Sequence, residues 1–287
     1  MAHPLPHELT EQITTSEQLE PAAAAVADLA TKLTESDPVK NALSGTWLGH
    51  RLHPMLTDVV IGAWMSASIL DVMAGKKARG AATTLVGVGI LASPVTAAAG
   101  LSDYADLYGG PRRLALVHGA VNVVGLAMQT RSFRARRQGK HIRGAMWSLA
   151  AMAGVGVGGY LGGHLSYVNG IGVDHTAFDE GPDEWTTAMP AGELEDGATS
   201  VVTVAGREVL LHRRDGRVMA MANRCTHAGL PMGEGAVQAD GCVTCEWHGS
   251  RYEPDGTVVR GPAASPQPVF EVREVQGLIE IRAATSR

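Results

Sequence analysis

The amino-acid sequence predicts a protein of two parts: a bundle of four transmembrane helices, followed by a small antiparallel β domain. Charged residues are concentrated in residues 1–40 and 174–287, whereas residues 53–171 are mostly Ala, Val, Leu, Gly and Met. The last part of the chain instead alternates short β-branched runs with turn signals. With 287 residues, the chain is long enough for two domains.

Four apolar stretches predict the membrane helices. They cover residues 54–73, 81–101, 114–128 and 145–168, and the third is the shortest. A transmembrane helix needs about 20 mostly apolar residues. Buried helices of a soluble protein are the alternative, but four such runs in a row, joined by short polar segments, favour a membrane. Glycines at every fourth residue of the last stretch, as at Gly154, Gly158 and Gly162, are typical of helices that approach closely in lipid.

The loop charges predict the orientation. The joints "GKKARG" and "RSFRARRQGKHIRG" are basic, whereas the joint "SDYADLYGGPRR" between them is acidic until its end. Basic loops stay in the cytoplasm. We therefore expect a multi-pass protein of the cell membrane, in contact with lipid, with both termini and the β domain outside. Arg136 and Arg137 are either part of these retained charges or a twin-arginine export signal.

The expected domain boundaries follow from composition. Residues 1–45 form an acidic N-terminal segment with an amphipathic helix over about residues 16–33, whose apolar face holds Leu19, Val26, Leu29 and Leu33. The segment lacks the apolar core of a cleavable signal peptide. Residues 46–168 are the membrane domain, residues 169–183 a linker and residues 184–287 the β domain. The net charge of -5 is too mild to indicate a nucleic-acid partner.

Two Cys and two His in the β domain indicate a metal centre. Cys225 and His227 form C-x-H, and after seventeen residues Cys245 and His248 form C-x-x-H. Thiolates suit iron, and imidazoles suit iron or zinc, so two ligands on each of two loops can hold a cluster between the loop tips. Zinc is the alternative, because Cys242 completes a C-x-x-C pair with Cys245. With three cysteines in the chain, a disulfide framework is not expected.

This pattern resembles the Rieske iron–sulfur family, and the resemblance covers the whole tail. It implies that a [2Fe–2S] cluster is bound, with Cys225 and Cys245 on one iron and His227 and His248 on the other. The histidine edge would be the exit for the electron.

Further residues of the motif bear on the reduction potential. The resemblance implies that Ser250 and Tyr252 hydrogen-bond to a cluster sulfide and a ligand cysteine, which raises the potential. Respiratory members carry a disulfide where this chain has Leu230 and Trp247. That departure resembles the ferredoxins and oxygenases of the family, which work at lower potential, so we expect an intermediate value.

Polar residues inside the apolar stretches suggest a second site. Because successive helices alternate in direction, six of them are expected near the outer face: His53, Asp58, Asp103, His118, Asn122 and His164. Ionisable groups in a membrane are costly and indicate function. Three interpretations are open: haem b ligated by His118 and His164, a quinol site, or a structural layer of hydrogen bonds. The stretch "HRLHP" and its four-helix context resemble an uncharacterised bacterial membrane domain family, which implies no chemistry.

The sequence therefore predicts a membrane-anchored protein that passes single electrons. The donor would be a quinol, a haem or a reductase, and the acceptor a redox partner protein such as an oxidase or oxygenase. The sequence shows no second domain with a mononuclear iron, so it is not expected to be a terminal oxygenase on its own. The alternative function is a redox-sensing or assembly protein that uses the cluster as a switch.

Overall fold

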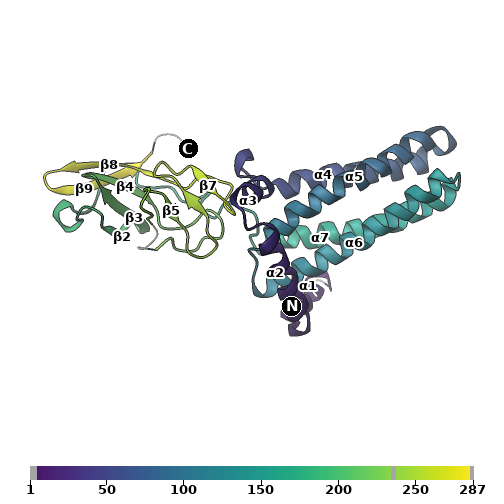
Figure 1. The fold of residues 1–287 in the computed structure, drawn as a ribbon, viewed down its shortest axis with the longest axis horizontal. Helices are drawn as coiled ribbons and strands as arrows, with labels where there is room; N and C mark the ends of the chain where they lie inside the picture. The colour runs from purple at the N-terminus through teal and green to yellow at the C-terminus, as the bar shows by residue number, and fades with distance from the viewer. Residues whose placement is uncertain (1–4, 234–236, 285–287) are drawn as a thin grey trace. The chain divides into compact units, whose positions relative to one another are not determined.

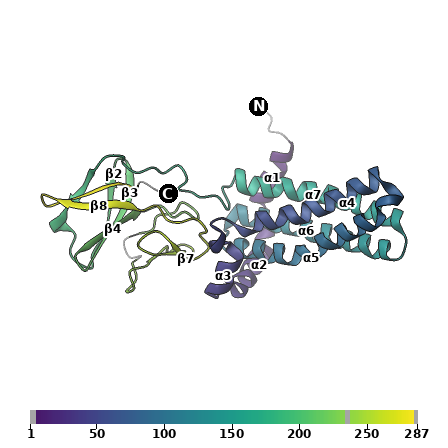
Figure 2. The same ribbon diagram turned by 90° about the horizontal axis from the view of Figure 1, so that it is seen from above.

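The computed structural model describes residues 5–233 and 237–284. Its contacts divide the chain into two compact units. The helical unit comprises Met1–Ser36 and Leu52–Ile171, and the β unit comprises Asp37–Arg51 and Gly172–Arg287. The fold class predicted from the sequence, a helical bundle joined to a small antiparallel β domain, is confirmed (Figures 1 and 2).

Four long helices form the helical unit: α4 (Leu52–Met73), α5 (Arg79–Tyr104), α6 (Gly109–Arg137) and α7 (His141–Tyr167). Helix α4 packs mainly on α5, and α6 packs mainly on α7. Contacts of α5 with α6 and of α4 with α7 close the bundle. Side chains such as Trp64 of α4 and Val155 of α7 are buried together between the helices.

Three segments in the described part of the chain are long and apolar enough to cross a membrane: Leu52–Met73, Gly75–Tyr104 and His141–Tyr167. Helix α6, which contains the third apolar stretch, is not among them. It extends well beyond residues 114–128 at both ends, because the Arg and Ala residues that flank the stretch are good helix formers. Its polar His118, Asn122 and Gln129 lower its hydropathy.

A buried ion pair joins α6 to α4. The Arg136 side chain is fully buried and donates to Asp71 through both terminal nitrogens, with Nη1 lying 2.8 Å from Oδ1. Its Nε donates to Ser132 Oγ at 3.0 Å. One of the two arginines that resemble an export signal therefore has a partner in the fold, whereas Arg137 is exposed. Removing one member of a buried pair costs about 3–5 kcal/mol.

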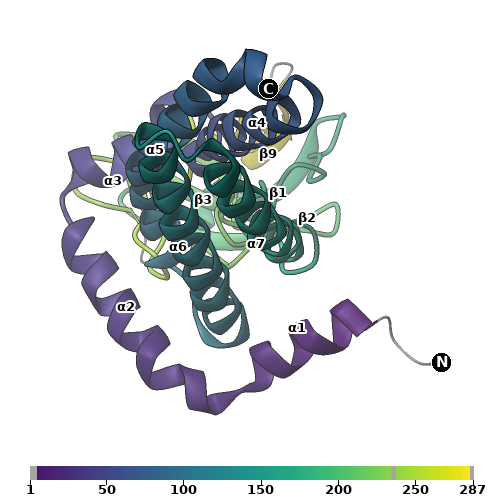
Figure 3. The same ribbon diagram turned by 90° about the vertical axis from the view of Figure 1, so that its right-hand side faces the viewer.

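The N-terminal helices pack along the outside of the bundle (Figure 3). They are α1 (Leu5–Thr15), the 3-10 turn η1 (Glu17–Leu19) and α2 (Glu20–Leu33). The single helix predicted over residues 16–33 is thus divided, since Pro21 in the first turn favours a new start at Glu20.

The buried face of α2 also differs from the prediction. It buries the small side chains of Ala23, Ala27 and Ala30, which permit close packing, whereas Leu29 and Leu33 are exposed. Glu20 forms ion pairs with Arg112 and Arg113 of α6, the second at 2.6 Å.

Three antiparallel three-stranded sheets form the β unit, with strand orders β1-β9-β8, β2-β3-β4 and β5-β6-β7. The strands are β1 (Thr186–Pro190), β2 (Thr199–Val204), β3 (Arg207–Arg214), β4 (Arg217–Ala222), β5 (Val243–Thr244), β6 (Arg251–Tyr252), β7 (Val258–Arg260), β8 (Phe270–Val275) and β9 (Leu278–Ala283). Two-residue turns at Ala205 and Asp215, each followed by Gly, join β2 to β3 and β3 to β4. All four residues have positive φ, as tight hairpin turns require.

Two segments at the edges of the sequence-based domains pack with the β unit. Helix α3 (Asp37–Ser44) and the 3-10 turn η2 (Thr46–Leu48) belong to it by their contacts, although the sequence places most of them with the N-terminal segment. The interior of the β unit has two apolar clusters. Cys225 and Cys245 belong to the one that contains Tyr252.

Candidate functional site

Two loops with the same backbone fold carry the Cys/His motif. The first comprises residues 225–230 and follows β4, and the second comprises residues 245–250 and connects β5 to β6. In each loop the Cys carbonyl accepts from the Gly N–H four residues later, at 2.9 Å. The Cys N–H donates to the carbonyl five residues later, at 2.9 Å in the first loop and 2.8 Å in the second. Gly229 and Gly249 have φ of 71° and 74°, which explains glycine at both positions.

The two sulfurs lie together at the base of these loops. Cys225 and Cys245 are each 1% exposed, and their thiols hydrogen-bond to one another. The peptide N–H groups two and three residues after each cysteine donate to its sulfur. The Cys245 thiol lowers the pKa of Cys225 to about 6, and the Tyr252 hydroxyl acts in the same direction. The pKa of Cys245 is raised, first by this hydrogen bond to Cys225 and then by burial.

Tyr252 lies against the first sulfur. Its hydroxyl is 3.2 Å from Cys225 Sγ and 3.0 Å from Thr226 Oγ1. Burial and the neighbouring Cys225 raise the pKa of Tyr252 well above its usual range, so the hydroxyl keeps its proton as a donor. Ser250 is fully buried, and its Oγ accepts the Ala263 N–H at 3.0 Å, which leaves the hydroxyl proton for another acceptor. Both side chains thus lie in the interior beside the motif.

The two histidines face each other. The rings of His227 and His248 are 4.7 Å apart between centroids and almost perpendicular, at 83°. Burial, followed by the Arg51 guanidinium, holds the pKa of His227 well below its usual range, so the imidazole is neutral. Its Nδ1 is buried and has no hydrogen-bond partner among the described residues. Because buried polar atoms are almost always paired, this nitrogen is a metal-ligand candidate.

The donor set fits a [2Fe–2S] cluster. Within residues 5–233 and 237–284, no three His, Cys, Asp or Glu side chains converge on one ion. A closed zinc site would need such convergence, whereas a cluster with two protein ligands on each iron does not. Cys242 is a half-buried free thiol, and burial raises its pKa.

Trp247 ties the two loops together. Its indole N–H donates to the Pro231 carbonyl at 3.1 Å, across from the second loop to the chain just after the first. Leu230 and Trp247 occupy the two positions at which the respiratory members of the family that this chain resembles carry a disulfide. In this chain the indole–carbonyl hydrogen bond connects the two loops instead, and the sequence did not predict it.

The structure brings together three of the six polar residues in the apolar stretches. The rings of His53 and His118 lie 6.4 Å apart. Nδ1 of His53 donates to the Thr96 carbonyl at 2.9 Å, and Nδ1 of His118 donates to the Gly158 carbonyl at 2.9 Å. Asn122 donates to Nε2 of His118 at 3.0 Å. All four long helices contribute a residue to this layer, and both ring nitrogens of His118 are hydrogen-bonded.

The other three polar residues lie elsewhere. His164 packs against the rings of His7 and Tyr160, at 6.1 and 6.3 Å. Asp58 is exposed on α4, and Asp103 is half-buried near the end of α5. The single group of six expected from the sequence is therefore not formed. Sequence reasoning also missed the backbone acceptors of the layer, because a carbonyl has no residue-type signature.

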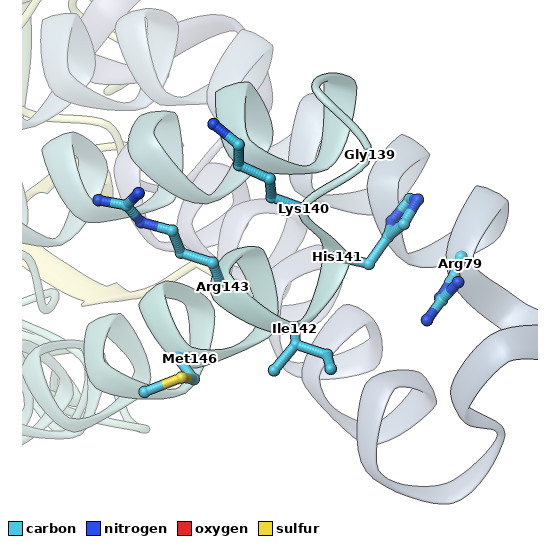
Figure 4. A pocket seen from close by; sticks show the side chains of 7 residues that line it. All are labelled: Arg79, Gly139, Lys140, His141, Ile142, Arg143 and Met146. Atoms are coloured by element: carbon cyan, nitrogen blue, oxygen red, sulfur yellow. The ribbon is translucent and has the colours of Figure 1, made fainter.

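An open cavity of about 390 Å³ lies where α5 and α7 begin (Figure 4). Its basic lining residues are Arg79, Lys140, His141 and Arg143. Arg79 and His141 lie on the same side of Ile142, whereas Lys140 and Arg143 extend away from them. The exposed apolar side chains of Ile142 and Met146 complete the lining. A cationic rim beside apolar surface is typical of a site for lipid headgroups.

Family models match both the helical and the β part of the chain. Residues 184–271 match the family described as Rieske [2Fe-2S] domain, and residues 49–175 match the family described as predicted membrane protein (DUF2231). Aminopyrrolnitrin oxygenase of Pseudomonas fluorescens is 35% identical over 79 residues, which are 27% of this chain and 21% of that protein. Iron-sulfur subunit 3 of the cytochrome b6-f complex of Nostoc sp. is 38% identical over 63 residues, 22% of this chain and 34% of that subunit.

The solved structures that match also cover only part of this chain. The terminal oxygenase of carbazole 1,9a-dioxygenase from Nocardioides aromaticivorans IC177 is 28% identical, with a TM-score of 0.33 over 38% of this chain and 32% of that one. The ferredoxin of the same system is 22% identical, with a TM-score of 0.32 over 35% of this chain and 98% of that one. The chain spans about a fifth of the length of the first curated relatives that it matches. The two family matches thus describe a predicted membrane protein domain followed by a Rieske [2Fe-2S] domain.

Proposed function

We propose that the chain is a membrane-anchored carrier of single electrons, with Cys225 and Cys245 holding one iron of the cluster and His227 and His248 the other. The observation that carries this proposal is the pair of matching loops, which present two buried sulfurs and a histidine pair with an unpartnered nitrogen. When bound, the cluster would accept and release one electron.

The surrounding residues would tune that exchange. Peptide N–H groups and the Tyr252 hydroxyl donate to the sulfurs, so they stabilise the extra negative charge of the reduced state and raise the potential. Compared with a thiolate ligand, the neutral His227 ring adds no negative charge to the cluster, so it also raises the reduction potential.

The proposed partners are a reductase or quinol as donor and an oxidase or oxygenase as acceptor. The curated relatives include oxygenases and a subunit of a cytochrome complex. We assign the layer of His53, His118 and Asn122 to interhelical hydrogen bonding. A haem iron at His118 would have to displace either Asn122 or the Gly158 carbonyl.

For the membrane domain we propose four spans, with the β unit on the outer side. The basic joints and the cavity at Arg79 and His141 lie at the bundle end that the charge rule assigns to the cytoplasm, where anionic headgroups would bind. The opposite end holds the α5–α6 joint against which α2 packs. The exposed Leu29 and Leu33 of α2 suit a helix lying in the membrane interface.

Metal analysis of the purified full chain tests the central proposal. We expect iron and sulfide in equal amounts and, after reduction, the low mean g-value of Rieske centres in electron paramagnetic resonance. Cys242→Ser should leave the spectrum unchanged, because Cys242 lies outside the ligand set. Stoichiometric zinc without sulfide would contradict the proposal. A cluster that is reduced without passing electrons to any acceptor would instead support a redox-sensing role.

Protease treatment of intact spheroplasts tests the orientation. We expect cleavage near Gly181 in the wild type, because the β unit would be outside. Arg137→Lys tests the export signal without disturbing the fold, because Arg137 is exposed and lysine keeps the positive charge. Arg136→Lys also disturbs the ion pair with Asp71 and serves as its structural control. Protection of the wild type would place the β unit in the cytoplasm and reverse the proposed orientation.

A further inference from the structure

The two segments that connect the units in sequence both belong to the β unit. The incoming connection is residues 37–51, before α4, and the outgoing connection is residues 172–183, after α7. Both precede the Rieske match, which begins at residue 184. Each nevertheless contacts one of the two Cys/His loops or a residue that is hydrogen-bonded to it.

The incoming connection holds the strand beside the second loop. Asn41 of α3 donates to the Val259 carbonyl at 2.8 Å, and its Oδ1 accepts the Gly261 N–H at 2.9 Å. One amide side chain thus bonds two backbone groups on either side of Arg260. Ser44 packs on Gly261 as well, where an added Cβ would lie 3.3 Å from its Oγ.

Arg260 extends this contact into the second loop. Its Nε donates to Asp37 Oδ1 at 2.6 Å. Its Nη1 donates to the carbonyls of Gly249 and Gly261, both at 3.0 Å. Gly249 directly follows the ligand candidate His248. A single guanidinium therefore joins the incoming connection to the backbone of the residue that follows the histidine.

The outgoing connection holds the first loop. The His175 N–H donates to the Thr226 carbonyl at 3.0 Å, between Cys225 and His227. A Cβ on Gly229 would lie 3.3 Å from the His175 Cβ, so the segment packs tightly on the loop. Each connection thus contacts a different half of the motif.

The two connections also contact one another. Lys40 and Arg51 of the incoming connection are only 3% and 7% exposed. Arg51 packs against Gly172, the first residue of the outgoing connection, where an added Cβ would be 3.4 Å from Arg51 Cγ.

We propose that the two connections are part of the cluster centre: Asn41 and Arg260 position the second loop, and His175 positions the first. This proposal rests on the proposed function.

Hydrogen–deuterium exchange tests whether Asn41 and Arg260 position the second loop, and the measurement needs no metal. Asn41→Asp places a carboxylate against the Val259 carbonyl, so amides of residues 245–252 and 259–261 should exchange roughly tenfold faster, and residues 225–230 should not. If Asn41→Asp does not fold, Arg260→Lys removes the forked contacts and should act on the same amides. Unchanged exchange in both variants would refute the positioning role. Absence of a cluster from the wild type would refute the proposed function alone, since exchange is measured on the metal-free chain too.

Discussion

Each unit contains a pair of histidines at almost perpendicular ring planes, and the two pairs differ in what their nitrogens contact. His227 and His248 lie 4.7 Å apart at 83°, and His53 and His118 lie 6.4 Å apart at 79°. In the β unit, Nδ1 of His227 is buried without a partner among the described residues. In the helical unit, both nitrogens of His118 are hydrogen-bonded, and Nδ1 of His53 is bonded to Thr96.

This contrast supports His227 and His248, rather than His53 and His118, as the proposed ligand pair. A buried imidazole that satisfies its donor and acceptor within the fold already contributes to stability, and a metal would have to break those bonds. A buried nitrogen without a partner costs free energy until something binds it. Residue type and the angle between the ring planes alone would rank the two pairs alike.

The largest expected effect separates the two pairs directly. His227→Ala removes a ligand candidate, so iron and sulfide should fall from about two each per chain to almost none. His118→Ala should leave the metal content unchanged. Iron and acid-labile sulfide analysis of the two purified variants measures this. Equal loss of iron from both would show that the comparison is wrong.

The next effect concerns the stability of the helical unit. Asn122→Leu removes the donor to His118 and should lower the free energy of unfolding by about 0.6–2 kcal/mol. Val123→Ala, at a 66% exposed position of α6, is the control and should change it little. Thermal unfolding in detergent gives the values. Normal stability together with lost cluster reduction by a quinol would identify the layer as a quinol site.

A smaller effect tests the tuning of the cluster pair. Tyr252→Phe removes a hydrogen bond to Cys225 worth about 1 kcal/mol, which corresponds to a decrease of about 40 mV for a one-electron couple. Ser250→Ala should act in the same direction. Redox titration followed by electron paramagnetic resonance provides the measurement, with Cys242→Ser as the control. If neither variant shifts the midpoint, these hydroxyls donate to other acceptors.

The smallest effect lies outside both pairs and concerns pH. Hydrogen bonds from Arg112 and Arg113 lower the pKa of Glu20 below its usual value of about 4.5. The stabilisation is therefore complete above pH 4.5 and is lost as the pH falls through the lower folded value. Exchange of the α2 amides should increase in that acid range in the wild type, and Glu20→Gln should remove this dependence. A response centred near pH 6.5 would indicate a histidine instead.

Much of the local structure could be predicted because its cause lies within a few residues. The apolar runs predict helices α4, α5 and α7, and the Gly-containing turns at Ala205 and Asp215 predict hairpins, since φ > 0 and helical periodicity are local properties. The boundaries were less predictable: the length of α6 and the division between η1 and α2 depend on competing short-range preferences.

The spacing of Cys225, His227, Cys245 and His248 is specific enough to indicate an iron–sulfur domain from the residues alone, and the apolar runs before it indicate a helical membrane domain. Which histidines have hydrogen-bond partners depends instead on how distant segments pack. The acceptor of His118 is the carbonyl of Gly158, and the contacts of Asn41 are backbone groups more than two hundred residues away. Every residue has a carbonyl and all but proline an N–H, so these partners leave no trace in residue type and arise only when distant segments are packed together.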